Sequence, residues 1–347
     1  MKVTQLLCAA GPVDAVTNQA IICRELYRAW GWSGNDYAPV IAPGMPHGTI
    51  KHLHERRPAR DEVVVLHYSG WAEGLERAFD GSRPSLLISH NITPSRYFWE
   101  HEPVQAVHNE MGLEQLARLI RSASVVAGVS EYNAQQLRAL GASDPQVIPI
   151  LLDSALLGLP AWGTGAPSPT VLFVGRLVPH KRQDLVIRAF ARFHARNPEA
   201  RLVLVGVPLS DGYKGALVEL AERLAPGAVE FEDGLSAGQL ADRYLSAGVF
   251  LCLSEHEGFC IPLLEAMHFG VPVIARDAGA IGEVVGDAGV LVGEDDGVDV
   301  VAELLGLVTS DEELRGSLRE RGARRLEHYD REAVAAQLRG VIESLGK

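Results

Sequence analysis

The sequence repeats one pattern through both halves: a short apolar run rich in β-branched residues, a polar or glycine-rich turn, and an amphipathic helical stretch. Repetition of this pattern is typical of parallel βαβ units. The runs at 63–66 and 171–174 contain no polar residue, which predicts strands covered by helices on both faces. The chain is therefore expected to be an α/β protein built on parallel sheets.

The predicted strands fall into two groups. A helix is also predicted over 18–30, where apolar residues recur at helical spacing and Gly31 can end the helix. The strands of the first half are 3–9, 37–42, 63–66, 86–89, 125–129 and 146–150, and those of the second half are 171–174, 201–205, 228–232, 249–253, 272–275 and 289–292.

The chain has 347 residues, enough for two domains that each bury a core. Residues 153–169 are rich in glycine, proline and serine, which interrupt regular elements, so the domain junction is predicted there. The predicted boundaries are 1–155 for an N-terminal domain, 156–169 for a linker and 170–325 for a C-terminal domain. A final helical stretch, 326–347, has no strand after it and could pack back on the N-terminal domain.

Composition and charge argue against several classes of protein. The 32 basic and 44 acidic residues give a net charge of −12, which opposes non-specific binding to nucleic acid or to an anionic membrane. The four cysteines are too scattered for a zinc or redox motif, and they fit a reducing cytoplasm. No run approaches the ~20 apolar residues of a membrane span, so any membrane contact is expected to be peripheral.

Basic residues follow the first predicted strand of the second half. Gly175 and Arg176 come directly after it, and Lys181 and Arg182 precede a helix that is expected to begin near Asp184. Ligands bind outside the carboxyl ends of parallel strands, and a helix N-terminus disfavours cations by ~0.3–1 kcal/mol each. A bound diphosphate would compensate this cost. The alternative is that Asp184 and water neutralise the charges.

Carboxylates follow another strand, the one predicted at 249–253. Glu257 is expected in the loop after it, and a short helix is predicted from Pro262 to a cap at Gly270. Glu265 then falls at the end of the first helical turn, where its carboxylate can accept the two hydroxyl protons of a ribose diol. The alternative is that Glu265 only favours the helix dipole and that Glu257 is solvated.

The residues between Glu257 and this helix add backbone donors. Gly258, Phe259 and Cys260 are expected to present free N–H groups at the helix start, which suit the oxygen atoms of a ligand. A catalytic thiol at Cys260 has little support, because the sequence places no base beside it.

Together these motifs resemble a known family. Gly175-Arg176 with Lys181, followed by Ser-x-x-Glu-Gly-Phe-x-x-Pro-x-x-Glu-Ala over 254–266, is similar to the retaining glycosyltransferases of family 4, the glycosyl transferases group 1. The resemblance implies the GT-B fold: two Rossmann-like domains with parallel sheets facing across an interdomain cleft. The N-terminal domain would lie on the acceptor side, and the C-terminal domain would bind a nucleotide sugar. The resemblance covers 171–292 and, in the first half, 129–133 and 89–94.

The resemblance also implies a role for each candidate residue. Arg176 and Lys181 would contact the donor diphosphate after Gly175, and Glu265 would hold the ribose. His90 would lie near the hydroxyl groups of the donor sugar and the reaction centre, where its position at a strand end is shared with His67. The transferred sugar would be faced by Glu257 and by the backbone N–H groups of Gly258, Phe259, Cys260 and Ile261.

The N-terminal loop departs from the family pattern. Gly11 would belong to a phosphate-facing loop, but the sequence around it, Ala-Gly-Pro-Val-Asp-Ala, is poorer in glycine than is usual. The catalytic residues that the resemblance implies are His90, Arg176, Lys181 and Glu257. Gly11 is implied as a further residue that contacts the donor.

The implied reaction moves a hexose-type sugar, with retention, from a nucleotide-diphosphate donor to a hydroxyl acceptor in glycan or glycoconjugate biosynthesis. The donor would be a UDP- or GDP-sugar, and the acceptor a saccharide, a lipid-linked saccharide or a small molecule. No Asp-x-Asp motif is present, so chemistry without a metal or other cofactor is predicted, with cationic side chains stabilising the leaving group.

Other functions remain as alternatives at this stage. A sugar-nucleotide epimerase or a phosphorylase could share the GT-B outline but needs different site chemistry. A binding-only homologue is a third alternative, although it has no reason to keep both residue pairs and His90 together. A nicotinamide-dependent oxidoreductase is less favoured, because neither Gly11 nor Gly175 begins a Gly-x-Gly-x-x-Gly motif.

Three segments have weaker claims to function. The aromatic residues Tyr97, Phe98 and Trp99 could line an acceptor cleft or cover the core of the first domain. Gly206 ends a predicted strand and could either turn the chain or approach the nucleotide. A local excess of basic residues could meet an anionic acceptor or a membrane surface, or form a solvated loop. These basic residues are Lys51, Arg56, Arg57 and Arg60.

Overall fold

The computed structural model describes residues 1–12, 14–59, 61–152 and 168–346. The chain divides into two compact units, one formed by Met1–Leu151 with Tyr329–Lys347 and the other by Leu152–His328. Each unit is described by itself below. Most of the predicted linker, 156–167 of 156–169, lies outside the described residues.

The first unit is built on a seven-stranded sheet in the order β3-β2-β1-β4-β5-β6-β7. All of its strand pairs are parallel. The order reverses between β1 and β4, the point at which doubly wound sheets bind ligands. Its strands are β1 (Lys2–Leu7), β2 (Asp36–Ala38), β3 (Lys51–His52), β4 (Glu62–Tyr68), β5 (Ser85–Ser89), β6 (Val125–Gly128) and β7 (Gln146–Val147).

Helices connect these strands. The ends of the first helix, α1 (Ala15–Ala29), are set by its capping residues. The helix predicted over 18–30 begins at Ala15, because the carboxylate of Asp14 accepts a hydrogen bond from the Thr17 N–H at 2.8 Å. It ends before Gly31, whose φ of +78° continues the chain in the left-handed region. The helices of this unit are α1 (Ala15–Ala29), α2 (Leu75–Ala78), α3 (Pro103–Ser122), α4 (Glu131–Ala139) and α13 (Arg331–Leu345), with short 3-10 turns at Leu53–Glu55 and Ser95–Tyr97.

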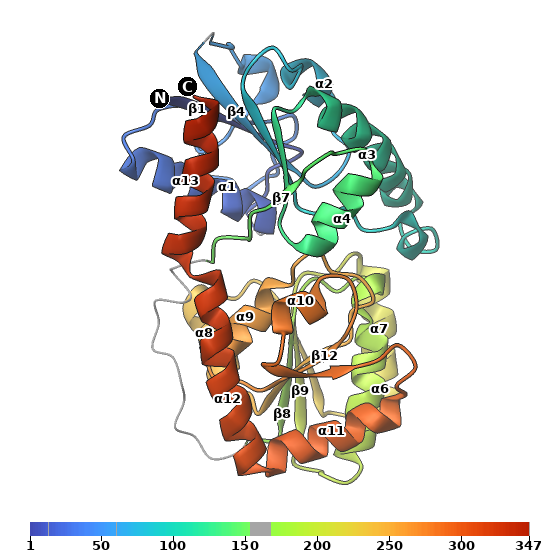
Figure 1. Ribbon diagram of the computed structural model, residues 1–347. Coiled ribbons are helices and arrows are strands. Elements are labelled where there is room, and N and C mark those ends of the chain that lie inside the picture. Colours follow the sequence, from blue (N-terminus) through green and yellow to red (C-terminus); the bar gives the residue numbers. More distant parts are fainter. Residues whose placement is uncertain (13, 60, 153–167, 347) are drawn as a thin grey trace. The chain divides into compact units, whose positions relative to one another are not determined.

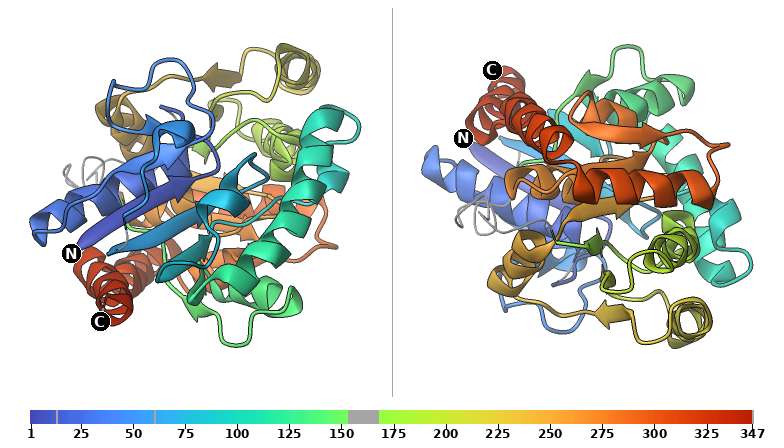
Figure 2. Two further views of the ribbon diagram at one scale, coloured as in Figure 1. Left: turned by 90° about the horizontal axis from the view of Figure 1, so that it is seen from above. Right: turned by 90° about the horizontal axis from the view of Figure 1, so that it is seen from below.

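The last helix, α13, belongs to the first unit although the second unit precedes it in sequence. The side-chain amide of Gln337 donates to the carbonyl oxygen of Val147 at 2.6 Å. The guanidinium of Arg339 lies 5.5 Å from the ring centroid of Trp30, which belongs to the segment after α1. Figure 2 shows the start of β1 and the end of α13 side by side. The two ends of the chain therefore contribute to one unit.

The second unit has a six-stranded parallel sheet in the order β10-β9-β8-β11-β12-β13. Here the order reverses between β8 and β11. The strands are β8 (Thr170–Val174), β9 (Arg201–Val205), β10 (Val229–Glu232), β11 (Val249–Cys252), β12 (Val273–Arg276) and β13 (Gly289–Val292). The helices are α6 (Gln183–His194), α7 (Asp211–Leu224), α8 (Ala237–Ser246), α9 (Ile261–His268), α10 (Ile281–Val285), α11 (Val298–Ser310) and α12 (Glu312–Leu326), with 3-10 turns at Pro179–Lys181 and Glu327–Tyr329.

The core of the second unit forms where helices cover the sheet. Phe173 of β8 packs in one buried cluster with Phe190 of α6 and Leu305 of α11, and none of these side chains is more than 1% exposed. Figure 1 shows α6 and α7 on one face of this sheet and α8 and α9 on the other. Helices thus cover both faces, as the uninterrupted apolar run of β8 predicts.

Each predicted strand is present, but two of them are shorter than predicted by three or more residues: the strand predicted at 37–42 stops at Ala38, and the one at 146–150 stops at Val147. Pro39 and Pro149 follow closely, and because proline has no N–H group it cannot donate to the ladder of hydrogen bonds. Beyond Pro39 the pairing resumes only as a bridge between Ala10 and Ile41. The two-residue edge strand β3 was not predicted, since so short a segment has no recognisable alternation.

Among the helices that the structure describes, none combines the length and apolar character that a bilayer crossing requires.

Replacing Gly206 with alanine should lower the free energy of unfolding by ~1–3 kcal/mol, the usual cost of overpacking. The added Cβ would lie 2.0 Å from the carbonyl oxygen of Gly175. Chemical denaturation measures the change. Gly215→Ala, within α7, is the matched control, because nothing lies within 4 Å of its added Cβ and alanine favours a helix by up to ~1 kcal/mol. An unchanged unfolding midpoint for Gly206→Ala would contradict this close approach.

Candidate functional site

The loop after β8 presents a cation to solvent. Gly175 donates its N–H group to the carbonyl oxygen of Val205 at 2.9 Å, and Gly206 packs directly against it. Arg176 follows, with its backbone oxygen accepting a hydrogen bond from the Gln183 side chain at 2.9 Å. The side chain of Arg176 is exposed, and no described residue forms an ion pair with it. Gly206 thus has a packing role, and Arg176 carries an uncompensated charge at the strand end.

Lys181 and Glu257, which the sequence places in separate motifs, form one ion pair. The ammonium nitrogen of Lys181 lies 2.5 Å from Oε1 of Glu257, and the hydroxyl of Ser254 donates to the same oxygen at 2.9 Å. The two charged side chains are 16% and 10% exposed. Burial alone would lower the pKa of Lys181, but the Glu257 carboxylate raises it above its ordinary value. Lys181 therefore stays charged at neutral pH.

Arg182 is neutralised within the chain. It stands at the start of α6 in the left-handed region, with φ +50°. Its guanidinium pairs with Asp184 at 2.9 Å and also with Glu255, and Arg276 reaches Glu255 at 3.4 Å. Hydrogen bonding to Asp184 raises the pKa of Arg182 above its ordinary value. For Arg182, the alternative reading of the sequence holds: Asp184 neutralises its charge. Glu255 also pairs with Arg182, a contact that the sequence did not predict.

A neighbouring loop holds the backbone of Glu257. The N–H group of Ala280 donates to the Glu257 carbonyl oxygen at 2.9 Å. A Cβ on Gly279, which has φ +60°, would lie 2.4 Å from that oxygen, so only glycine permits this approach. Gly279 was not among the predicted site residues, although the segment 277–282, which contains two glycines, directly follows a predicted strand.

The start of α9 differs by one position from its prediction. Ile261 is the first helical residue and Pro262 the second, because Cys260 occupies the cap position with φ +72°. A left-handed conformation costs ~1–2 kcal/mol for a residue other than glycine. Phe259 and Cys260 are buried, whereas Gly258 and Ile261 are partly exposed. The helix ends before Gly270 with φ +67°, as predicted.

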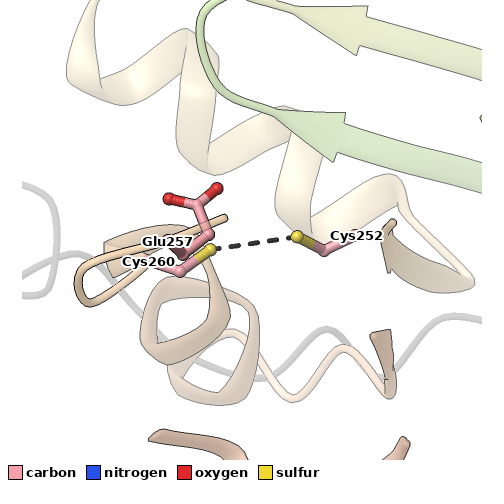
Figure 3. Close-up of side chains that lie close together, drawn as sticks. All are labelled: Cys252, Glu257 and Cys260. Carbon is pink, nitrogen blue, oxygen red and sulfur yellow. Dashed lines mark hydrogen bonds between the residues drawn. The ribbon is translucent and has the colours of Figure 1, made fainter. Parts of the chain in front are cut away.

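Two thiols lie beside the Glu257 carboxylate (Figure 3). The sulfur atoms of Cys252 and Cys260 are 4.0 Å apart, and one potential ligand atom from each of the three side chains lies within 4.8 Å of the others. A cation at this place would compete with Lys181 for the carboxylate. The hydrogen bond with Cys252 and burial raise the pKa of Cys260 well above its ordinary value, so this thiol is protonated and no nucleophile.

The Glu265 carboxylate is oriented by a neighbouring helix. The hydroxyl of Tyr244, in α8, donates to Oε2 of Glu265 at 2.7 Å. Tyr244 is completely buried and its ring stacks on Phe269 at a centroid distance of 5.3 Å. Burial raises the pKa of Tyr244 well above its ordinary value, so its hydroxyl keeps its proton. Tyr244 carried no signal in the sequence, because nothing in its own segment points to a carboxylate 21 residues away.

In the first unit, His90 follows β5 and contacts His67, the last residue but one of the neighbouring strand β4. Nε2 of His90 lies 3.0 Å from Nδ1 of His67, and Nε2 of His67 lies 2.8 Å from Oε1 of Gln5. Burial lowers the pKa of His90 to about 4 and that of His67 well below 6.5. Both imidazoles are therefore neutral at neutral pH.

Gly11 lies in a loop that is closed by side chains. Its N–H group donates to the hydroxyl of Thr17 at 3.1 Å, and this hydroxyl donates to Asp14 at 2.7 Å. The nearest atom to an added Cβ at Gly11 is 3.7 Å away, so an alanine would fit. Val13 of the same loop lies outside the described residues. The backbone donor of Gly11 is thus occupied within the chain.

Known proteins identify the family. The family described as glycosyl transferases group 1 matches residues 161–325. A D-inositol 3-phosphate glycosyltransferase of Rhodococcus opacus is 30% identical over 318 residues, which are 86% of this chain and 70% of that protein. The corresponding protein of Rhodococcus jostii is 32% identical, over 86% of this chain and 69% of that protein. The chain belongs to the glycosyl transferases group 1 family.

Solved structures of low sequence identity share the fold of this glycosyltransferase. Sucrose-phosphate synthase from Thermosynechococcus elongatus superposes with a TM-score of 0.78 at 21% identity, covering 99% of both chains. The Anabaena protein HepE in complex with UDP-glucose gives a TM-score of 0.77 at 19% identity, covering 99% of this chain and 100% of that one. With its two Rossmann-like units, the glycosyltransferase has the GT-B fold.

The basic residues clustered near residue 56 of the glycosyltransferase differ in their exposure to solvent. Arg56 is buried and pairs with Glu62 at 2.7 Å, so it is neither a ligand contact nor part of a solvated loop. It is inside because Glu62 begins β4 with a side chain only 2% exposed and a buried carboxylate requires a partner. Lys51 is partly exposed, Arg57 is exposed and Arg60 lies outside the described residues.

The aromatic run of the glycosyltransferase also divides. Phe98 is buried and covers the core, Tyr97 is partly exposed, and Trp99 is 51% exposed. Core cover therefore accounts for Phe98 alone.

The ion pair predicts a stability coupling. Replacing Glu257 with glutamine leaves the Lys181 ammonium without its counter-charge and should lower the free energy of unfolding by ~2–3 kcal/mol, less than for a fully buried pair. The double variant Glu257→Gln with Lys181→Met removes both charges and should recover part of this loss. Urea denaturation of both single variants and the double variant measures the coupling. Strictly additive effects would show that the pair contributes nothing.

Proposed function

We propose that the chain is a retaining, metal-independent glycosyltransferase that moves a hexose from a nucleoside diphosphate to a hydroxyl group, in the biosynthesis of a glycan or glycoconjugate. One observation carries the proposal: the loops after β8 and β11, which flank the reversal point of the second sheet, bring Arg176, Lys181 and Glu257 to one strand edge. This is where doubly wound sheets bind nucleotides.

The cations suit a leaving diphosphate. Arg176 is exposed and unpaired among the described residues, and its planar guanidinium can hold phosphate oxygens in a bidentate manner. Lys181 is held charged by Glu257, so a diphosphate that reaches it would share an ammonium group that is already in place. Positive charge fixed before the reaction stabilises the negative charge that develops on the leaving group. The same charge is the reason to expect no metal requirement.

Glu265 suits the ribose of the donor. An ionised carboxylate has two oxygen atoms that accept hydrogen bonds. The two neighbouring hydroxyl groups of a ribose can each donate a hydrogen bond to one of them. The hydroxyl of Tyr244, from helix α8, fixes the orientation of this carboxylate. Pre-orientation of this kind reduces the entropy that is lost on binding.

Glu257 suits a sugar-facing role and not that of a nucleophile. Its Oε1 accepts from Lys181 and from Ser254, and its backbone is held against Gly279. These contacts withdraw negative charge from the carboxylate and fix its position, which favours hydrogen bonding to sugar hydroxyls. Retention would then follow from attack on the same face that the diphosphate leaves, without a covalent intermediate on this residue.

The relatives narrow the choice of substrates. They include a D-inositol 3-phosphate glycosyltransferase and a phosphatidyl-myo-inositol mannosyltransferase of Mycolicibacterium smegmatis, the latter 34% identical over 60% of this chain and 54% of that protein. HepE was solved with UDP-glucose. We therefore propose a UDP- or GDP-hexose as donor and a hydroxyl-rich acceptor: a saccharide, a lipid-linked saccharide or a small polyol.

A panel of nucleotide sugars tests the proposal. UDP-glucose, UDP-N-acetylglucosamine and GDP-mannose are incubated with the protein with and without EDTA, and thermal shift and nucleotide release are measured. At least one donor should raise the melting temperature and release its nucleotide, and the NMR coupling of the product's anomeric proton should match that of the donor. No response to any nucleotide sugar would refute the function, loss of activity in EDTA would refute metal independence, and an inverted anomer would refute retention.

Variants of the proposed donor site sharpen the test. Lys181→Ala and Glu265→Ala should weaken binding of the responsive nucleotide sugar while the fold persists. Unchanged affinity in both would show that the donor binds elsewhere. Arg192→Ala serves as the control, because this arginine lies in α6 with its side chain 65% exposed and paired only with Asp299 on the surface.

Tyr244→Phe isolates the orientation of Glu265. The ring packing is kept and one hydrogen bond to a charged group is lost, which is worth ~1.5–3 kcal/mol, so affinity for the nucleoside diphosphate should fall by roughly 10- to 100-fold. Calorimetric titration with the responsive nucleotide measures the loss. Tyr68→Phe is the matched control, since it also removes a buried hydroxyl, one that donates to the carbonyl oxygen of Gly112 at 2.7 Å within the first unit. Equal affinities in the two variants would contradict a role for Tyr244.

A further inference from the structure

The side-chain amide of Gln5 has a fixed orientation. Its Nε2 group donates to the carbonyl oxygen of Ala20 and to Oδ1 of Asp36, each at 2.8 Å. A carbonyl and an ionised carboxylate only accept hydrogen bonds, so the NH₂ side of the amide must face them. Asp36 is itself held by Arg24 at 2.6 Å. The oxygen of the Gln5 amide therefore has only one direction in which to point.

This orientation sets the proton on His67. Oε1 of Gln5 lies 2.8 Å from Nε2 of His67, and because an amide oxygen only accepts, Nε2 must carry a proton. His67 is completely buried, and burial, together with the neighbouring His90 and Arg24, keeps its ring neutral at neutral pH. A neutral imidazole has one N–H group. Nδ1 of His67 is therefore a bare acceptor.

The same reasoning sets the proton on His90. Nδ1 of His67 lies 3.0 Å from Nε2 of His90, so Nε2 of His90 must carry the proton and donate it to this hydrogen bond. Since His90 is also neutral at neutral pH, its Nδ1 is left as an acceptor. The described part of the chain offers this nitrogen no hydrogen-bond partner, and His90 is partly exposed.

We propose that Gln5 and His67 are positioning residues that lock His90 in its Nε2–H tautomer, so that His90 presents Nδ1 as a hydrogen-bond acceptor to a hydroxyl group of the sugar substrate. The inference rests on the proposed function, which assigns His90 to the sugar. It adds a reason for the buried polar chain from Asp36 through Gln5 to His67: every link is a hydrogen bond whose direction follows from the link before it.

The groups around His90 do not change their charge between neutral pH and the pKa of His90. Among the described residues, the titratable groups that face His90 are His67 of β4 and Cys23 of α1. His90 and Cys23 both line one small cavity. Burial raises the pKa of Cys23 to about 12, so this thiol stays neutral. The side of the cavity formed by α13 contributes only Val334 and Leu338. His90 should therefore lose its acceptor only when Nδ1 itself takes a proton, near pH 4.

The tautomer can be measured without substrate. The ¹⁵N chemical shifts of the His90 ring distinguish a protonated from a bare nitrogen, and the wild-type protein at pH 7 should show Nε2 protonated and Nδ1 bare. In His67→Leu and in Gln5→Leu, His90 should become a mixture of both neutral tautomers. A wild-type His90 protonated at Nδ1, or an unchanged single tautomer in both folded variants, would overturn the lock.

Kinetics with the donor found in the nucleotide-sugar panel test what the lock does. His67→Leu should lower kcat/KM at least tenfold with its circular dichroism spectrum unchanged. His67→Asn, whose amide oxygen can replace Nδ1 as acceptor, should recover most of the activity. His47→Leu, an exposed histidine of the same unit, is the control. Wild-type kcat/KM should stay level from pH 7 to about 5 and fall as Nδ1 protonates around pH 4.

The two readouts keep the failures apart. Full activity of folded His67→Leu would overturn the substrate role of the lock while glycosyl transfer stands. If no nucleotide sugar is used at all, the proposed function and the substrate role both fail, and the ring shifts still decide whether the tautomer is locked.

Discussion

The ion pair between Lys181 and Glu257 is the interaction on which the rest of the second unit's site depends. It joins the loops after β8 and β11, the two strands on either side of the reversal point. Because both side chains are largely removed from water, each charge requires the other, and the desolvation penalty therefore fixes the spacing of the two loops. Ser254 and Gly279 then complete the support of Glu257, one through its carboxylate and the other through its backbone.

In the first unit, the paired polar side chains at the strand ends are neutral groups. At its reversal point the side chains of His67 and His90 are joined by a hydrogen bond between rings that burial keeps uncharged. A charged pair attracts from any direction, whereas a chain of neutral hydrogen bonds has a direction, set at one end by Asp36 and passed on through Gln5. One unit thus holds fixed positive charge at the ends of its strands, and the other holds, under the proposed tautomer lock, a defined hydrogen-bond acceptor.

The elements of the fold were predictable because apolar runs and turn residues act locally. All of the predicted strands exist, and the two that fall shortest of their predicted ends are followed by Pro39 and Pro149, whose local effect the prediction did not take into account. The residues of the site motifs were also recognisable, since each follows a strand. Their partners were not. Tyr244 and Gly279 contact motif residues that lie about twenty residues away in the sequence, and no pattern within a segment records such a contact. Ser254, by contrast, belongs to the same motif as Glu257.

Periodicity and motif spacing are properties of neighbouring residues, and they were enough to predict the two parallel sheets, the family and the strand ends at which the candidate site residues lie. The sharing of charges, in contrast, became visible only in the folded chain. The tertiary structure paired Lys181 with Glu257 where the motifs suggested two independent ligands, gave Arg182 to Asp184 and Glu255, and buried Arg56 against Glu62. The physical reason is that the free energy of a charge depends on its distance from other charges and on its access to water, and both are fixed only when distant segments pack together.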